Sequence, residues 1–61
     1  MKPLNFRIAL VIAGAGAFRI ALAQVLRNQG WLVHAIARAE QAFQILAHIP
    51  YELIIIDSDL D

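Results

Sequence analysis

Short apolar runs alternate along the 61-residue chain with segments whose apolar positions follow a helical period. Three runs have the length and β-branched content of strands that are covered on both faces: residues 7–12, 31–37 and 52–57. Between them, residues 17–29 and 39–48 repeat their apolar positions at about 3.6 residues, as helices do. This order predicts an α/β fold, a βαβαβ unit with a three-stranded parallel sheet.

Each predicted helix carries an apolar stripe that we expect to face the sheet. In the first helix the stripe comprises Phe18, Ala21, Leu22, Val25 and Leu26. In the second helix it comprises Ala42, Phe43 and Leu46. Gly30 and Pro50 are typical of the positions where helices end.

The composition favours a larger assembly. Hydrophobic residues make up 61% of the chain, against about 45–50% in typical soluble domains. A chain of this length buries only about 60% of its unfolded surface. We therefore expect either part of a larger domain or a homo-oligomer. Cysteine is absent, which excludes disulfides and agrees with a cytoplasmic location.

Charge and hydropathy argue against two classes of partner. The five basic residues all precede the five acidic ones, and they are too widely spaced for a nucleic-acid-binding face. Residues 8–18, as long as any uncharged stretch in the chain, fall short of the ~20 residues that a membrane span needs. We expect neither nucleic acid nor a membrane as a partner of this segment.

Candidate chemistry lies where the predicted strands end, because ligands of open parallel sheets collect at the carboxyl ends of the strands. Asp57 closes the most apolar strand, and Asp59 follows it closely. A phosphoryl group or a metal ion could approach a carboxylate in this position. The alternative is a solvated carboxylate that marks the end of a strand.

The joint spacing of three segments resembles a known family. The segments are residues 21–37, the run Glu-Gln-Ala-Phe-Gln-Ile-Leu at 40–46, and Tyr-Glu-Leu-Ile-Ile-Ile-Asp-Ser-Asp-Leu at 51–60. Together they resemble the N-terminal half of a response-regulator receiver domain of two-component signalling, which has a flavodoxin-like, doubly wound fold. The resemblance implies a single partial domain over residues 1–61, a strand order of 2-1-3, and Asp57 as the phosphoacceptor.

The chain departs from this family at its metal site. The family's first strand ends in two acids that hold Mg²⁺, whereas this chain has Ala13 and Gly14 there. Asp57 and Asp59 are the remaining candidate ligands, so we expect weakened Mg²⁺ binding and no efficient phosphorylation of Asp57. The resemblance then implies a pseudo-receiver that is not an enzyme and that acts through protein contacts or dimerisation.

The resemblance also implies partners. In receivers the first helix contacts a histidine kinase or phosphotransfer protein, which makes Arg19 and Arg27 candidate docking residues; we expect both to be solvated. An output domain is a further partner that the resemblance implies. The predicted strand at residues 53–56 would leave an open apolar edge, at which two copies of the chain could pair.

A second motif supports an alternative function. Gly14 and Gly16 match two of the three glycines in the dinucleotide fingerprint, between a strand and a helix. Arg38, after the second strand, could meet an NADP 2′-phosphate. The alternative is therefore the N-terminal segment of an NAD(P)-dependent dehydrogenase. Arg19 stands at the third glycine, however, and no acid ends the second strand to bind a ribose.

Overall fold

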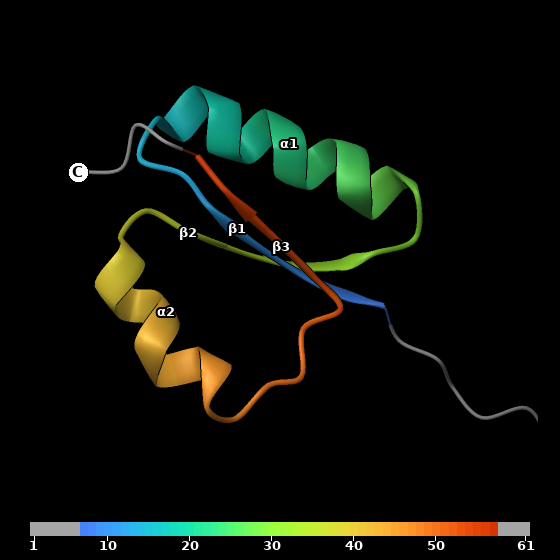
Figure 1. Cartoon of the computed structure of the whole chain (residues 1–61). Helices are drawn as coiled ribbons and strands as arrows, with labels where there is room; N and C mark the ends of the chain where they lie inside the picture. Colours follow the sequence, from blue (N-terminus) through green and yellow to red (C-terminus); the bar gives the residue numbers. More distant parts are fainter. Residues whose placement is uncertain (1–6, 58–61) are drawn as a thin grey trace, which may run out of the picture.

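The computed structural model describes residues 7–57, which form a three-stranded parallel sheet with one helix on each face (Figure 1). The elements are β1 (Ile8–Ile12), α1 (Gly16–Asn28), β2 (Leu32–Ile36), α2 (Ala39–Leu46) and β3 (Leu53–Ile56). Both β2 and β3 pair with β1 in parallel, in the order β2-β1-β3. The predicted α/β fold and strand order are confirmed, and each element begins and ends within two residues of its predicted bounds.

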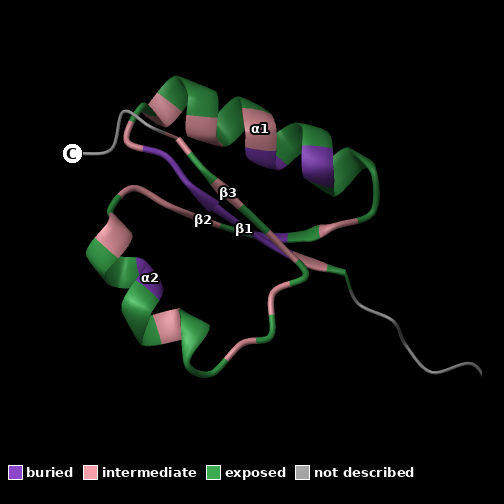
Figure 2. Cartoon of the chain, viewed as in Figure 1, coloured by how far each residue is buried: buried purple, intermediate pink, exposed green. Residues whose placement is uncertain are grey.

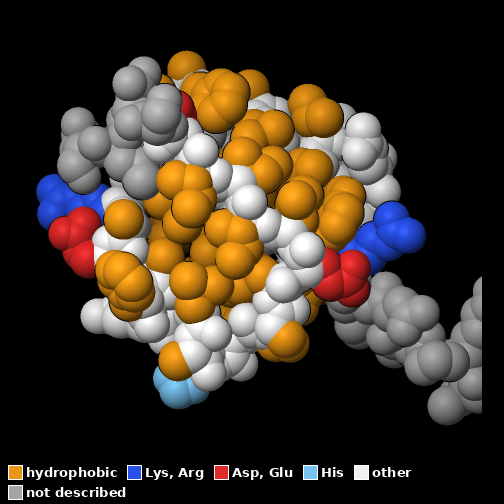
Figure 3. Space-filling view, viewed as in Figure 1, with side chains coloured by type: hydrophobic (Ala, Val, Ile, Leu, Met, Phe, Trp, Pro, Cys, Tyr) orange, Lys and Arg blue, Asp and Glu red, His pale blue; other side chains and the backbone are white. Residues whose placement is uncertain are grey.

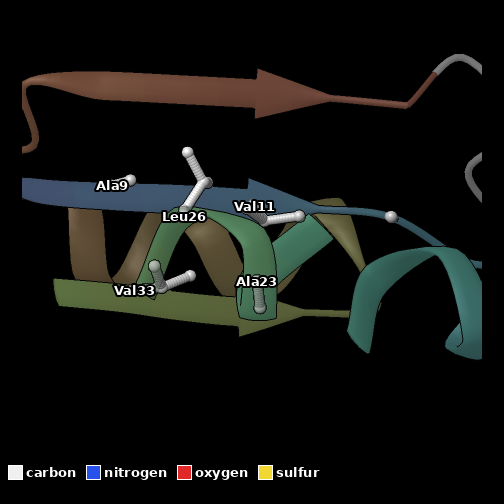
Figure 4. Close-up of a cluster of buried hydrophobic side chains, with 6 residues drawn as sticks. Ala9, Val11, Ala23, Leu26 and Val33 are labelled. Carbon is white, nitrogen blue, oxygen red and sulfur yellow. The ribbon is translucent and has the colours of Figure 1, made fainter. Parts of the chain in front are cut away.

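The central strand β1 forms the core because it has a strand on each side and a helix over each face. Leu10 and Val11 are fully buried. Alternate side chains point to opposite faces of a strand, so Ala9 and Val11 pack towards α1 while Leu10 packs towards α2. Figure 4 shows the α1 side of this core, with Ala23 of the helix over the strands.

The packed face of α1 is rotated by about one residue from the predicted stripe. Ala23 and Leu26 are buried and Leu22 packs beside them, whereas Phe18 and Val25 are 48% and 52% exposed. The small side chain of Ala23 lets the helix backbone approach the sheet closely. The prediction for Phe18, Ala21 and Val25, all of them exposed, is therefore wrong.

The packed face of α2 also differs from the prediction. Ala42 is buried as expected and Ile45 packs beside it, but Phe43 is 76% exposed and Leu46 is exposed as well. Within residues 7–57, no element covers the side of α2 that bears Phe43. Figure 2 shows the result, with burial concentrated in β1 and the inner side of α1.

Candidate functional site at the carboxyl ends of the strands

The end of β3 and the loop after β1 lie together at one edge of the sheet. The Asp57 N–H donates to the Ile12 carbonyl at 2.9 Å, and the Ala13 N–H donates to the Ile36 carbonyl of β2 at 3.0 Å. Asp57 therefore lies beside the residues that follow β1, as the sequence predicts. Asp59 lies outside the described residues.

Arg19 extends over this edge from the start of α1. Its Nη1 donates to the carbonyl oxygens of Ala13, at 2.8 Å, and of Gly14, at 3.4 Å. The side chain is half-buried, whereas the sequence predicts that it is solvated. Arg19 lies one turn before Leu22 and Ala23, so it continues the packed stripe of α1 to the edge of the sheet.

The N-terminus of α1 opens at the same place. Its N-cap is Ala15, which provides no side-chain hydrogen bond, and no acid stands in the first turn. The free N–H groups and the helix dipole add partial positive charge. The edge therefore combines the Arg19 guanidinium and a helix N-terminus with the carboxylate of Asp57.

The described residues at this edge offer Mg²⁺ few ligands. Ala13 and Gly14 have no ligating side chains, and their carbonyl oxygens, which could have served instead, accept hydrogen bonds from a guanidinium. Two cations cannot share these oxygens without strong repulsion. Among residues 7–57, no group of three or more histidine, cysteine or acidic residues lies together as a metal site would need.

The dinucleotide alternative also finds little support in the geometry. A Cβ added at Gly16 would meet only Arg19 Nη2, at an ordinary 3.6 Å, so no close approach requires glycine there. Arg38 follows β2 with an exposed side chain, and its backbone N–H donates to Gln41 Oε1 at 3.4 Å. The part of the chain that the structure describes contains no pocket.

Arg19 and Arg27 lie at opposite ends of α1. They are eight positions apart in the helix, which is about 12 Å along the axis. Arg27 is exposed, and its Nη2 donates to the Val33 carbonyl of β2 at 3.0 Å. Each guanidinium is thus held by a backbone carbonyl, and the proposed docking role of the pair stays a prediction.

One polar contact was not predicted. On the α2 side of the sheet, His34 Nδ1 and the Tyr51 hydroxyl are hydrogen-bonded at 2.5 Å, and the two rings meet edge to face. Burial raises the pKa of Tyr51. The two residues are seventeen apart in sequence, and only the strand order reveals that they meet.

The chain was compared with family models, curated proteins and solved structures, and nothing matched it. No helix of the described part is long and apolar enough to cross a membrane. The sheet edge that Arg19 and Asp57 share is the candidate functional site.

Proposed function

We propose that the chain is a pseudo-receiver module, which acts by protein–protein contact and not by phosphoryl transfer to Asp57. One observation carries this proposal: Arg19 donates to the carbonyl oxygens of Ala13 and Gly14 at the edge where β3 ends in Asp57. The strand order β2-β1-β3 supports the receiver-like part of the proposal. A cytoplasmic location belongs to the same proposal.

The chemistry of the edge supports our proposal that Asp57 is not phosphorylated efficiently. Transfer of a phosphoryl group to a carboxylate brings anions together, and receivers neutralise this charge with Mg²⁺ held by acids. Here a guanidinium supplies a fixed positive charge instead. Arginine stays protonated and cannot exchange with solvent as a metal does. The charge at this edge is thus independent of Mg²⁺ concentration.

The test is incubation of the chain with acetyl phosphate and Mg²⁺, followed by intact-protein mass spectrometry. We expect no phosphorylated species, just as in an Asp57→Asn control. A triple variant, Ala13→Asp with Gly14→Asp and Arg19→Ala, restores two acids and removes the competing cation. We expect this variant to gain Mg²⁺-dependent labelling that a further Asp57→Asn substitution abolishes.

Two outcomes would contradict the proposal. Mg²⁺-dependent labelling of the unmodified chain at Asp57 would show that the edge is a working phosphoacceptor site. Failure of the triple variant to label, with its circular dichroism spectrum unchanged, would remove the receiver interpretation of Asp57.

A further inference from the structure

The two outer edges of the sheet differ in how they are protected. The Leu32 N–H donates to the Arg7 carbonyl, and the Ile36 carbonyl accepts a hydrogen bond from the Ala13 N–H. These two residues of β2 therefore direct their backbone groups to β1. Alternate residues of a strand face opposite neighbours, and Val33 therefore faces outwards. Its carbonyl accepts the hydrogen bond from Arg27 at 3.0 Å. A long charged side chain thus blocks this edge, as in many natural sheets.

Among residues 7–57, no side chain protects the edge of β3 in this way. The Asp57 N–H donates to the Ile12 carbonyl, and Ile12 is the register partner of Ile56. Because alternate residues of a strand face opposite neighbours, Leu53 and Ile55, like Asp57, direct their backbone groups to β1. The N–H and C=O groups of Ile54 and Ile56 therefore face the outer edge. No strand of the described part pairs with them, and their side chains are 44% and 61% exposed.

Apolar side chains are exposed at this open edge and on the helix that covers the same side of the sheet. Ile54 and Ile56 point to the α2 side of the sheet, because Leu53 and Ile55 pack on the α1 side. Phe43 and Leu46 of α2 are exposed as well. We call the two exposed isoleucines at this edge, Ile54 and Ile56, the apolar patch. Figure 3 shows hydrophobic side chains gathered on the face that bears β3, with both basic and acidic side chains at each of two opposite margins.

We propose that the β3 edge binds a second copy of this chain, with the two β3 strands antiparallel and Ile54 opposite Ile56 of the second copy. A two-fold axis relates identical surfaces and therefore requires the two strands to run antiparallel. In this register Ile54 and Ile56 of each copy lie opposite residues of the other copy whose backbone groups also face outwards. Each opposite pair exchanges two N–H···O hydrogen bonds. The product is one continuous sheet of six strands.

The charges of the chain favour a second copy as the occupant. The formal net charge is zero, so two copies do not repel each other over long range. Each of the two margins carries both signs of charge, and a two-fold rotation brings opposite margins together. In the proposed register Glu52 and Asp57 of the second copy are not opposite each other, because their side chains point to different faces of the sheet.

This inference names the partner of the protein contact proposed above and rests on that proposal. The two can fail separately, because one is tested by phosphoryl labelling and the other by molecular mass. A monomer without labelling would overturn the inference alone, and a labelled dimer would overturn the proposed function alone.

The experiment is size-exclusion chromatography with light scattering on the whole chain. We expect a mass about twice the 6.8 kDa of one copy. Ile56→Lys places a charge in the apolar patch and should halve the mass while the circular dichroism spectrum is retained. Ile20→Lys is the matched control, because Ile20 is equally exposed but lies on α1; its mass should remain that of a dimer.

Proline variants test the backbone part of the proposal. Ile54→Pro removes an outward N–H and should give a folded monomer, whereas Ile55→Pro removes an N–H that faces β1 and should unfold the chain. A mass of 6.8 kDa for the unmodified chain at every concentration would overturn the inference. A dimer that persists in both Ile56→Lys and Ile54→Pro would overturn it as well.

Discussion

At the scale of single residues, Gly16 and Gly30 make different demands on the backbone. Gly30 has a φ of +95°, between the end of α1 and the start of β2. A side chain at this φ is strained by about 1 kcal/mol or more. Gly16 begins α1, and a Cβ there has room. Glycine is therefore required at position 30 and not at position 16.

Alanine at these two positions gives a matched comparison. We expect Gly30→Ala to lower the free energy of unfolding by about 1 kcal/mol. Gly16→Ala should leave it unchanged or raise it by up to about 1 kcal/mol, because alanine restricts the unfolded chain. Urea unfolding at one fixed protein concentration measures both. Equal effects of the two substitutions would contradict this account of Gly30.

The raised pKa of Tyr51 predicts that the stability of the fold depends on pH. Burial raises the pKa of its phenol above the ordinary 10.0. The folded chain therefore holds this proton more tightly than the unfolded chain does. The contribution of Tyr51 to the free energy of unfolding is therefore fully present below about pH 10. It is lost as the pH rises further, through the pKa of the folded state.

Tyr51→Phe tests this dependence by thermal unfolding from neutral to strongly alkaline pH. At neutral pH the variant loses only the hydrogen bond to His34, at a cost of about 1 kcal/mol or less. Above about pH 10, its stability should fall less steeply than that of the unmodified chain. Parallel curves for the two proteins would refute the role of Tyr51.

Arg19 marks the limit of what the sequence predicts about the site. Asp57 could be placed at the sheet edge because a carboxylate after an apolar strand must lie there. The position of the Arg19 guanidinium depends instead on which face of α1 packs. With the stripe centred on Leu22 and Ala23, Arg19 falls on the packed side and reaches the Ala13 carbonyl. The predicted stripe, one residue away, places it in solvent.

At the scale of elements, the strands were easier to predict than the faces of the helices. A strand buried on both faces, such as β1, reads as a continuous apolar run. The helices carry apolar residues on more than one side, and Phe43 shows that the largest side chain does not decide which side packs. Small residues at the contact, Ala23 and Ala42, decide it by allowing close approach.

The protection of the β2 edge by Arg27 is an element-scale prediction. Arg27→Ala frees the Val33 carbonyl, so each copy then has two open edges. We expect this variant to form species larger than a dimer, because head-to-tail pairing through unlike edges does not close. Light scattering over a concentration series measures the change.

Gln24→Ala is the control for Arg27→Ala, because Gln24 is also exposed on α1. Its assembly should match that of the unmodified chain. A dimer that is unaffected by Arg27→Ala would show that the hydrogen bond to Val33 does not protect the edge.

At the scale of the whole molecule, a chain of 61 residues has little core with which to fold alone. Nine hydrophobic residues among those described are buried, and eight large ones are exposed. If a second copy covers part of the exposed set, folding and association are linked. The apparent stability of such a protein depends on its concentration.

Dilution tests this link. The thermal unfolding midpoint of the unmodified chain should rise as the protein concentration increases, because association favours the folded state. In Ile56→Lys the midpoint should be lower and independent of concentration. A midpoint that stays constant in the unmodified chain would separate its folding from association.

The parallel direction of the three strands has a consequence for the shape of the proposed dimer. A parallel sheet is polar: all the loops that follow its strands emerge at one end. A two-fold axis reverses this polarity between the two copies. Arg19 and Asp57 lie at the carboxyl ends of the strands, and in the dimer the two sets of carboxyl ends would point in opposite directions. They would be too far apart for one small ligand to bridge. Such a dimer is bivalent, and it would hold two partner molecules at opposite ends of one sheet.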